Sequence, residues 1–520
     1  MDTKALRQKI LDLAIRGKLV PQDPNDEPAS VLLERIRAEK QQMVKEGKLK
    51  AKDIKNDTVI FKGDDNLHYE KFPDGSVKCI EEEIPFELPQ GWEWSRFSSA
   101  FIINPRNNLP DDTEVSFVPM SLIQEGYANN HTFEKKTWST VKSGFTHFAE
   151  NDIGVAKITP CFENKKSVVF GNLTNGFGAG TTELHIIRSI NDSICPEYVL
   201  WFIKTDSFIS NGVNAFSGAV GQKRIGKDFV EKYLIPIAPT SEQKRIVERI
   251  STAFKFIDDI DASKEAFKLD VEIIKSKILD LAIRGKLVPQ DPNDEPASVL
   301  LERIRAEKEE LIKQGKIKRD KKESVIFKGE DNSYYDDIPE NWCISCLSEI
   351  TSPLHLNDGD WILSDNMVPF GEIKLIQLGS VGFLQYNDKG FKYLSNEMFK
   401  ELNCTEIFSG YMLINRIISD KMCSCILPEI DGKKITTVDT CWVAPNDKWY
   451  NLKYLMYAIS SPHFQSLVMM YSSGTTRRRI SKLNLVKLPL AFPPLPEQAR
   501  IVKAIETAFA QLDEISNSIA

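Results

Sequence analysis

The sequence predicts an α+β chain in which two mixed α/β domains are separated by a long antiparallel coiled coil. Three observations lead to this prediction: an unchanged internal repeat, a sustained heptad pattern in the middle of the chain, and short β-type runs between the repeated parts. Because the duplication is internal, we expect a pseudo-two-fold relationship between the halves.

Length and composition limit the class of protein. The 520 residues exceed what one hydrophobic core supports, so two or more domains are expected. The chain has no apolar run of about 18 residues and no apolar N-terminal segment, so we expect neither a membrane span nor a secretory signal. The nine cysteines are therefore expected to be reduced, in the cytoplasm.

The net charge of −7 argues mildly against a stand-alone nucleic-acid binder, because such domains are usually basic. Two explanations stay open if the protein binds nucleic acid. Either its basic patches are local, or partner subunits neutralise much of the phosphate charge.

A duplication determines the predicted architecture. Residues 9–40 recur without a change at 277–308. Weaker matches pair 45–50 with 313–318, 59–63 with 325–329, 88–92 with 338–342, 217–225 with 473–480, and 242–254 with 497–509. The middles of the halves diverge, whereas the repeated segments around them, the frame, are preserved. Neutral drift alone would change the frame and the middles to the same extent. One scaffold that carries two different recognition surfaces explains this pattern.

A heptad seam predicts the coiled coil. Between Ile246 and Leu281 apolar residues recur at gaps of four and three, with Lys264 at the one polar position. The same seam recurs at 501–519 and 6–13, so we expect the terminal helices to pair antiparallel with the central one. Ordinary helical hairpins are the alternative. A spacer of fixed length would set the separation of two DNA half-sites.

The predicted segments follow from these patterns. They are an N-terminal helix (1–20), a charged helical linker (21–85), a first variable domain (86–240), a central coiled-coil helix (241–288), a repeated charged linker (289–336), a second variable domain (337–496) and a C-terminal coiled-coil helix (497–520). Short Val, Ile, Phe and Tyr runs in the variable domains predict mixed sheets, with helices at 196–210 and 452–469.

Several loops of the variable domains carry side chains suited to DNA. Arg and Lys match guanine and phosphate, Asn and Gln match adenine, and Thr matches phosphate or the thymine methyl. The candidates are Arg106, Asn107, Asn108, Lys165, Lys166, Thr181, Thr182, Gln222, Lys223 and Arg224 in the first domain, and Arg416, Thr476, Arg477, Arg478 and Arg479 in the second. Polar loops are often only solvated surface, which is the alternative interpretation.

Motifs for chemistry are missing. The sequence has no GxxxxGK[ST] motif, no HExxH and no GxSxG. Cys343 and Cys346, with Cys423 and Cys425, could be imagined as a zinc site, but the second spacing is poor and the first pair is typical of a strand. We therefore predict no catalytic residue and no metal in this chain.

With these features in view, the chain resembles the specificity subunit of type I restriction–modification systems. The resemblance covers nearly all of the chain. It rests on Leu11–Pro21, Ile84–Trp92, Ile158–Cys161, Gly180–Glu183 and Pro494–Gln498. The first-half counterpart of the last block, Pro239–Gln243, departs from it but keeps Glu-Gln. In the second variable domain, 413–417 and 437–440 lie at places comparable to 158–161 and 180–183.

The resemblance implies that 86–240 and 337–496 are target-recognition domains, each of which reads one half of a split DNA sequence. It implies assembly with two methyltransferase subunits and, optionally, two ATP-dependent translocase–nuclease subunits. The chain would hold no cofactor, while the complex would use S-adenosylmethionine, and ATP with Mg where the nuclease subunit is present. Two alternatives stay open: a self-contained methyltransferase or nuclease with degenerate motifs, and an assembly hub that does not bind DNA.

Overall fold

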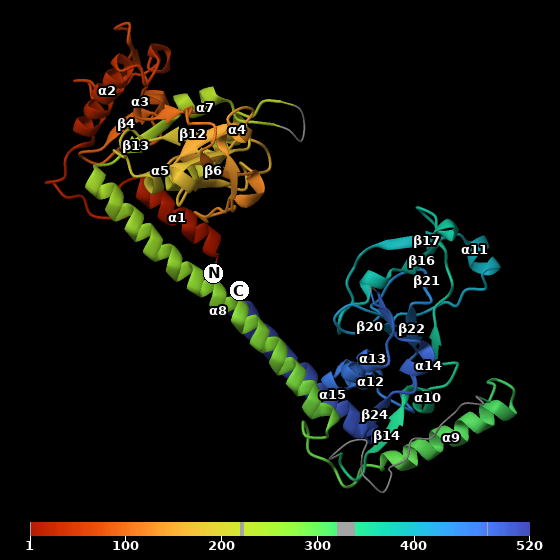
Figure 1. Ribbon diagram of the computed structural model, residues 1–520. Coiled ribbons are helices and arrows are strands. Elements are labelled where there is room, and N and C mark those ends of the chain that lie inside the picture. Colours follow the sequence, from red (N-terminus) through yellow and green to blue (C-terminus); the bar gives the residue numbers. More distant parts are fainter. Residues whose placement is uncertain (1, 219–222, 320–337, 476, 520) are drawn as a thin grey trace. The chain divides into compact units, whose positions relative to one another are not determined.

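The chain forms two compact units, Met1–Ser263 and Lys264–Ala520, each of which combines helices with several small sheets (Figure 1). The computed structural model describes residues 2–218, 223–319, 338–475 and 477–519. The predicted α+β class with two mixed domains is confirmed, and helix α8 (Thr240–Ile283) is the predicted long helix. None of the helices in these described ranges is long and apolar enough to cross a membrane.

Three helices form the frame of unit 1: α1 (Thr3–Ile15), α2 (Ala29–Lys45) and the first part of α8. Arg7 of α1 forms an ion pair with Asp258 at 2.5 Å, whereas Asp26, further along the chain, pairs with Arg245 at 2.6 Å. The partner of the later residue, Asp26, comes earlier in α8 than the partner of Arg7. The chain therefore runs antiparallel to α8 from α1 onward. Ile246, Ile250 and other residues of the heptad seam are buried there.

The second part of α8 packs in the same way within unit 2. Its partner is α15 (Leu495–Ile519), and α9 (Ala297–Lys313) is the counterpart of α2. Lys275 of α8 pairs with Asp513 at 2.5 Å, and Asp294 pairs with Arg500 at 2.7 Å. The antiparallel direction predicted from the heptads is therefore found inside each unit.

The chain after α2 forms a three-stranded antiparallel meander. Its strands are β1 (Val59–Lys62), β2 (His68–Lys71) and β3 (Val77–Cys79). Asn66 and Gly75, with φ of 70° and 87°, make the tight turns between the strands. The prediction of a helical linker over 21–85 is therefore wrong for this part, because its many charges hid the β-type run at 59–61.

The first variable domain consists of three small sheets with short helices around them. The strand orders are β10-β9-β12-β5, β7-β6-β11-β8 and β13-β4. The strands are β4 (Glu93–Arg96), β5 (Ile102–Ile103), β6 (Glu114–Val118), β7 (Glu134–Thr137), β8 (Thr146–Ala149), β9 (Ile153–Ala156), β10 (Ser167–Val169), β11 (Phe177–Gly180), β12 (Leu184–Arg188) and β13 (Leu234–Ile237). The helices are α3 (Phe97–Ala100), α4 (Trp138–Val141), α5 (Pro196–Ile203), α6 (Asp206–Asn214) and α7 (Lys227–Lys232).

The second variable domain repeats the main sheet with different loops. The strand orders are β15-β22-β18-β20, β17-β16-β21, β14-β24 and β19-β23. The strands are β14 (Cys343–Cys346), β15 (Leu356–Asp358), β16 (Ile373–Ile376), β17 (Phe391–Leu394), β18 (Met412–Asn415), β19 (Ile417–Ile418), β20 (Ser424–Ile426), β21 (Lys433–Thr436), β22 (Thr440–Val443), β23 (Arg478–Arg479) and β24 (Pro489–Phe492). The helices are α10 (Leu347–Ile350), α11 (Asn396–Glu401), α12 (Leu452–Ser460), α13 (Pro462–Met470) and α14 (Lys482–Leu485).

Both helices predicted inside the variable domains are broken into two. Thr205 begins α6 by accepting a hydrogen bond from the Phe208 amide at 3.4 Å, so the helix predicted over 196–210 divides there. Ser461 does the same before α13, where it accepts from the Phe464 amide at 3.4 Å. A side-chain cap therefore starts each second helix, which hydrophobic spacing does not reveal.

The glutamine of each repeated Glu-Gln pair ties a variable domain to a frame helix. Gln243 accepts a hydrogen bond from the Cys195 amide at 2.8 Å and donates one to the Ala238 carbonyl at 2.8 Å. Gln498 makes the same two bonds, with the Asn451 amide at 2.8 Å and the Pro493 carbonyl at 2.9 Å. Each buried amide satisfies one backbone donor and one backbone acceptor. The Glu-Gln pair therefore recurs in both halves although the residues around it differ.

Candidate nucleic-acid interface

In unit 1, one edge of the β9–β12 sheet holds the loop that follows α6. The Lys157 amide, just after β9, donates a hydrogen bond of 3.0 Å to the carbonyl of Glu183, just before β12. Ser217 and Arg224 exchange two backbone hydrogen bonds of 3.1 and 2.9 Å, which closes the loop. The Ile225 amide then bonds to the Lys157 carbonyl at 3.0 Å. The backbone thus holds the described ends of the loop, at Ser217 and Arg224, against this edge.

An ion pair fixes the direction of the loop's arginine. Nε and Nη2 of Arg224 each lie 2.9 Å from an oxygen of Glu183, which is a bidentate pair. The hydrogen bonds from Arg224 lower the pKa of the Glu183 carboxyl. Lys223, next to this pair, is exposed and free to meet a ligand in front of the loop.

The same arrangement recurs in unit 2 with different residues. The Arg416 amide bonds to the Asp439 carbonyl at 2.8 Å, and Ser473 and Arg479 exchange backbone bonds of 3.0 and 2.8 Å. The Ile480 amide bonds to the Arg416 carbonyl at 3.1 Å, while Nη2 of Arg479 lies 2.8 Å from Asp439. We call this sheet edge with its closed loop and ion pair the loop edge of each domain.

The two loop edges correspond position by position. Lys157 and Arg416 follow equivalent strands, Glu183 and Asp439 supply the carboxylate, and Arg224 and Arg479 supply the guanidinium. Sequence comparison placed 413–417 and 437–440 only roughly, because the side chains around them differ. Backbone pairing makes the correspondence exact to the residue.

Several candidates of the first domain lie together at its loop edge. Gly180 pairs with Thr146 across β11 and β8, which brings Thr181 and Thr182 beside the start of β8. Arg106 reaches the same place, since its Nη1 donates to the Phe145 carbonyl at 2.9 Å. The side chains of Arg106, Asn108 and Thr182 are exposed there.

Asn107 has a mainly internal role. Its Nδ2 donates to the Phe148 carbonyl at 2.8 Å, and its Oδ1 accepts from Nη2 of Arg188 at 3.1 Å. Both groups of the amide are therefore used within the domain, where they hold the segment that carries Arg106 and Asn108.

The ammonium groups of Lys165 and Lys166 both have partners inside the domain. Lys165 is buried, with Nζ at 2.6 Å from Asp206 and 4.9 Å from the ring centre of Tyr127. Lys166 directs its Nζ to the Met120 carbonyl at 3.4 Å. The ammonium of Lys165 stabilises the domain next to α1, so we leave Lys165 and Lys166 out of the residues we propose to touch DNA.

Arg416 is also an internal residue. It is 4 % exposed, and its guanidinium contacts Asp358 at 3.2 Å, the Ile480 carbonyl at 3.3 Å and the Val438 carbonyl. Arg416 therefore stabilises the loop edge of the second domain from beneath instead of facing a ligand.

The remaining second-domain candidates lie on the closed loop. Arg477 and Arg478 are exposed, and Arg479 is partly exposed beside Asp439. Gln222 and Thr476, the last two candidates, lie outside the described residues. The predicted site residues did not include Lys157, Glu183 and Asp439. Glu183 and Asp439 lie within 180–183 and 437–440, which the resemblance had already singled out, whereas the only signal for Lys157 was its position directly after a strand.

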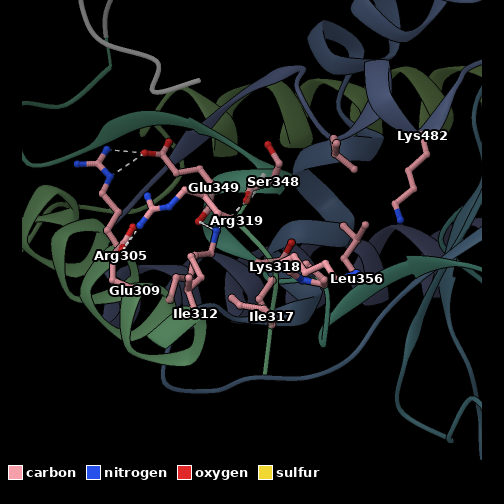
Figure 2. Close-up of a pocket in the computed structure, with 15 residues that line it drawn as sticks. Arg305, Glu309, Ile312, Ile317, Lys318, Arg319, Ser348, Glu349, Leu356 and Lys482 are labelled. Atoms are coloured by element: carbon pink, nitrogen blue, oxygen red, sulfur yellow. Dashed lines mark hydrogen bonds and ion pairs between the residues drawn. The ribbon is translucent and has the colours of Figure 1, made fainter. Parts of the chain in front are cut away.

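Unit 2 also contains a cavity of about 500 Å³ between α9, α10 and Lys482 (Figure 2). Four of the cations that line it are already engaged: Arg305 pairs with Glu349, Arg319 with Glu309 at 2.5 Å, Lys308 with the Ser348 carbonyl at 2.8 Å and Lys482 with Asn357 at 2.5 Å. In unit 1 the counterpart of Lys308, Lys40, binds Asp57 at 2.8 Å. We therefore assign this cavity to the frame and give it no ligand.

The described histidines and cysteines do not form a metal or nucleophile site. His185 lies 3.1 Å from the Ile225 carbonyl, and burial lowers its pKa, which keeps the ring neutral. Cys343 and Cys346 lie in β14, whereas Cys425 lies in β20 of another sheet. In the part of the chain that the structure describes, no three His, Cys, Asp or Glu residues gather around a possible ion position. The two loop edges present exposed charged and polar side chains, which are groups that can bind a ligand.

Comparison with known proteins relates the whole chain to one family. The model of the type I restriction modification DNA specificity domain matches residues 103–266 and 339–519. The EcoEI specificity subunit of Escherichia coli is 34 % identical over 99 % of this chain and 90 % of its own length. The EcoAI specificity subunit of the same organism is 38 % identical over 79 % of this chain and 71 % of its own.

The fold is also found among solved structures. One chain, from work on complex assembly and conformational transition of the type I R-M system, has a TM-score of 0.56 and 17 % identity. The match covers 84 % of this chain and 94 % of that one.

Proposed function

Since the chain belongs to the type I restriction modification DNA specificity family, we propose that it is the DNA sequence-recognition subunit of such a complex. Each variable domain is a target-recognition domain that reads one half of a bipartite sequence. The observation that carries this proposal is the loop edge, built identically in both units and bearing different exposed side chains.

The exposed side chains of each loop edge suit DNA. In the first domain Arg106, Asn108, Thr182 and Lys223 offer donors for phosphates and base edges, while the second domain offers Arg477 and Arg478. Because the two sets differ, the two half-sites differ, and the target is asymmetric.

Partner subunits supply the chemistry. We propose two methyltransferase subunits and, optionally, two ATP-dependent translocase–nuclease subunits, bound to a non-catalytic chain in the cytoplasm. The complex would use S-adenosylmethionine, and ATP with Mg where the nuclease subunit is present. The net charge of −7 supports this division of labour, since a chain this acidic needs partners to share the phosphates.

Co-purification of the chain from its native cell, followed by mass spectrometry, tests the assembly. We expect a methyltransferase at two copies per chain, and methylome sequencing of the same cell then gives the bipartite target. Recovery of the chain without any methyltransferase would contradict the proposal.

Two further measurements separate recognition from catalysis and from a purely structural role. DNA protection by the complex is expected in two patches about one helical turn apart, and a single continuous patch would count against two reading domains. The isolated chain is expected not to bind S-adenosylmethionine. Binding would instead favour a self-contained methyltransferase.

A further inference from the structure

An exposed tryptophan and an exposed leucine lie two positions apart in the second domain. Trp361 is 68 % exposed and Leu363 is 55 % exposed, whereas Ile362 between them packs onto the core of strands β16 and β21. This alternation presents both apolar side chains on one outer surface. Tryptophan is among the residues that folding buries most on average. An indole exposed to this extent is therefore typical of a binding surface.

The backbone places Trp361 at the loop edge. The Asp360 amide bonds to the Thr436 carbonyl at 2.8 Å, and the Val438 amide bonds back to the Asp360 carbonyl at 2.9 Å. The residue after Val438, Asp439, forms the ion pair with Arg479 of the closed loop. Trp361 therefore follows Asp360, which is hydrogen-bonded to the segment that ends in Asp439, the carboxylate of the loop edge.

The two domains differ in the segment that leads to this place. Ile103 pairs with Ile187 on β12, as Leu356 pairs with Val443 on the equivalent strand β22. In the first domain β5 ends at Ile103 and Asn104 has a φ of 56°, whereas in the second β15 continues to Asp358. The course of the segment that carries Trp361 is therefore one of the differences between the two domains.

We propose that Trp361 and Leu363 form an apolar base-contact surface through which the second domain reads its half-site. The proposal rests on the proposed function. The flanking Arg477 and Arg478 would lie against phosphates, while the indole lies against base edges in the major groove. The thymine 5-methyl group is the only apolar group that base pairs present there, so the second half-site contains a thymine that this surface contacts.

The charges nearby favour DNA over a protein as the occupant. Arg477 and Arg478 are exposed on the adjoining loop, and Asp365, two positions after Leu363, is exposed as well, whereas three other carboxylates near Trp361 are occupied. Asp358 is paired with Arg416, Asp439 with Arg479, and Oδ2 of Asp360 accepts from the Thr405 amide at 2.8 Å. An apolar surface beside two exposed arginines, with three of the nearby carboxylates occupied, matches the bases and phosphates of a duplex.

The test uses Trp361→Ala in the chain assembled with its methyltransferase subunits. Binding is measured on a duplex with the target found by methylome sequencing, and on one with the second half-site scrambled. We expect about tenfold weaker binding to the target and unchanged binding to the scrambled duplex. Trp361→Phe should recover part of the loss.

Deoxyuridine in place of each thymine provides an independent readout, because it removes only the 5-methyl group. One replacement in the second half-site should weaken wild-type binding about threefold, roughly the value of one buried methyl. The same replacement should not change binding by Trp361→Ala. If wild-type binding is insensitive to every replacement in that half-site, the assigned contact is wrong.

Phe370→Ala is the matched control. Phe370 is 88 % exposed in the same domain, but it precedes Ile373, where β16 begins. Trp361 instead follows Asp360, which pairs with Thr437 beyond the other end of the parallel β16–β21 pair. We expect this variant to bind as the wild type does. Because both side chains are exposed, both variants should unfold at the wild-type temperature.

The outcomes also separate this inference from the proposed function. A wild-type complex that lacks sequence-specific binding overturns both. Specific wild-type binding with an unchanged Trp361→Ala complex overturns the apolar contact alone. Loss of a methyltransferase copy from the Trp361→Ala complex also overturns it, since the surface would then be a protein interface.

Discussion

Trp342 donates a hydrogen bond of 3.0 Å from its indole Nε1 to Oε2 of Glu497, across 155 positions of the chain. The bond joins the start of the second variable domain to the first turn of α15. Trp92 makes the same bond of 2.9 Å to Glu242 in unit 1. Each buried carboxylate also accepts from a glutamine, Gln22 or Gln290, of the unchanged repeat. Three sequence motifs thus meet at one buried carboxylate in each half.

Trp342→Phe is expected to destabilise unit 2 by about 1–3 kcal/mol, because it removes a donor from a buried carboxylate and leaves that carboxylate undersatisfied. Urea unfolding measures the change. Trp361→Phe is the control, since it makes the same substitution at an exposed indole and should have little effect. Equal stability of the two variants would show that the Trp342–Glu497 bond contributes nothing.

Gly17→Ala is expected to destabilise unit 1 more than Gly47→Ala does. Both glycines have positive φ, 62° and 71°, so each alanine costs about 1 kcal/mol in backbone strain. A Cβ on Gly17 would also meet Pro89 Cγ at 2.3 Å, whereas one on Gly47 meets nothing within 4 Å. Thermal unfolding of the two variants isolates the cost of that clash, and similar melting temperatures would mean that Pro89 moves aside freely.

Lys223→Ala and Arg477→Ala are each expected to weaken DNA binding by the assembled complex and to lower the slope of log K against log salt by about 1. The physical reason is the loss of one phosphate contact and its released counterion. Binding titrations at several salt concentrations measure the slope. Lys400→Ala, an exposed lysine on α11, is the control and should leave the slope unchanged. An unchanged slope in the loop variants would remove these side chains from the interface.

The stability of unit 1 is expected to depend on Lys204 above neutral pH. Burial lowers the pKa of Lys204 from its ordinary 10.5 to about 7, while Nζ donates to the Gly126 and Lys165 carbonyls at 2.7 and 2.8 Å. Between these two pKa values the unfolded chain holds the proton and the folded chain does not. The free energy of unfolding therefore rises with pH, by up to about 1.4 kcal/mol per unit.

Urea unfolding of wild type and Lys204→Met at pH 7 and pH 9 measures this linkage. The wild type should gain stability relative to the variant as the pH rises. Parallel behaviour of the two proteins would mean that Lys204 keeps its proton inside the folded domain.

Local patterns were sufficient for much of the fold. The heptads located α8 and α15, and the short β-type runs predicted the mixed sheets of both variable domains. Local patterns did not predict the structure where turn residues and side-chain caps compete with hydrophobic spacing. The charged segment 59–79 forms strands, and the two predicted helices break at Thr205 and Ser461, because turn residues and side-chain caps outweigh hydrophobic spacing.

By itself the sequence determined the duplication, the long helix, the family and the set of loops that carry DNA-compatible side chains. Those properties lie in contiguous residues. Only the tertiary structure decided which candidates face outward. Lys165 and Arg416 are buried against Asp206 and Asp358, while Trp361, which no polar pattern marks, is exposed at the loop edge. The physical reason is that backbone pairing between segments far apart in the chain, such as Lys157 with Glu183 and Ile158 with Arg224, determines where each side chain points.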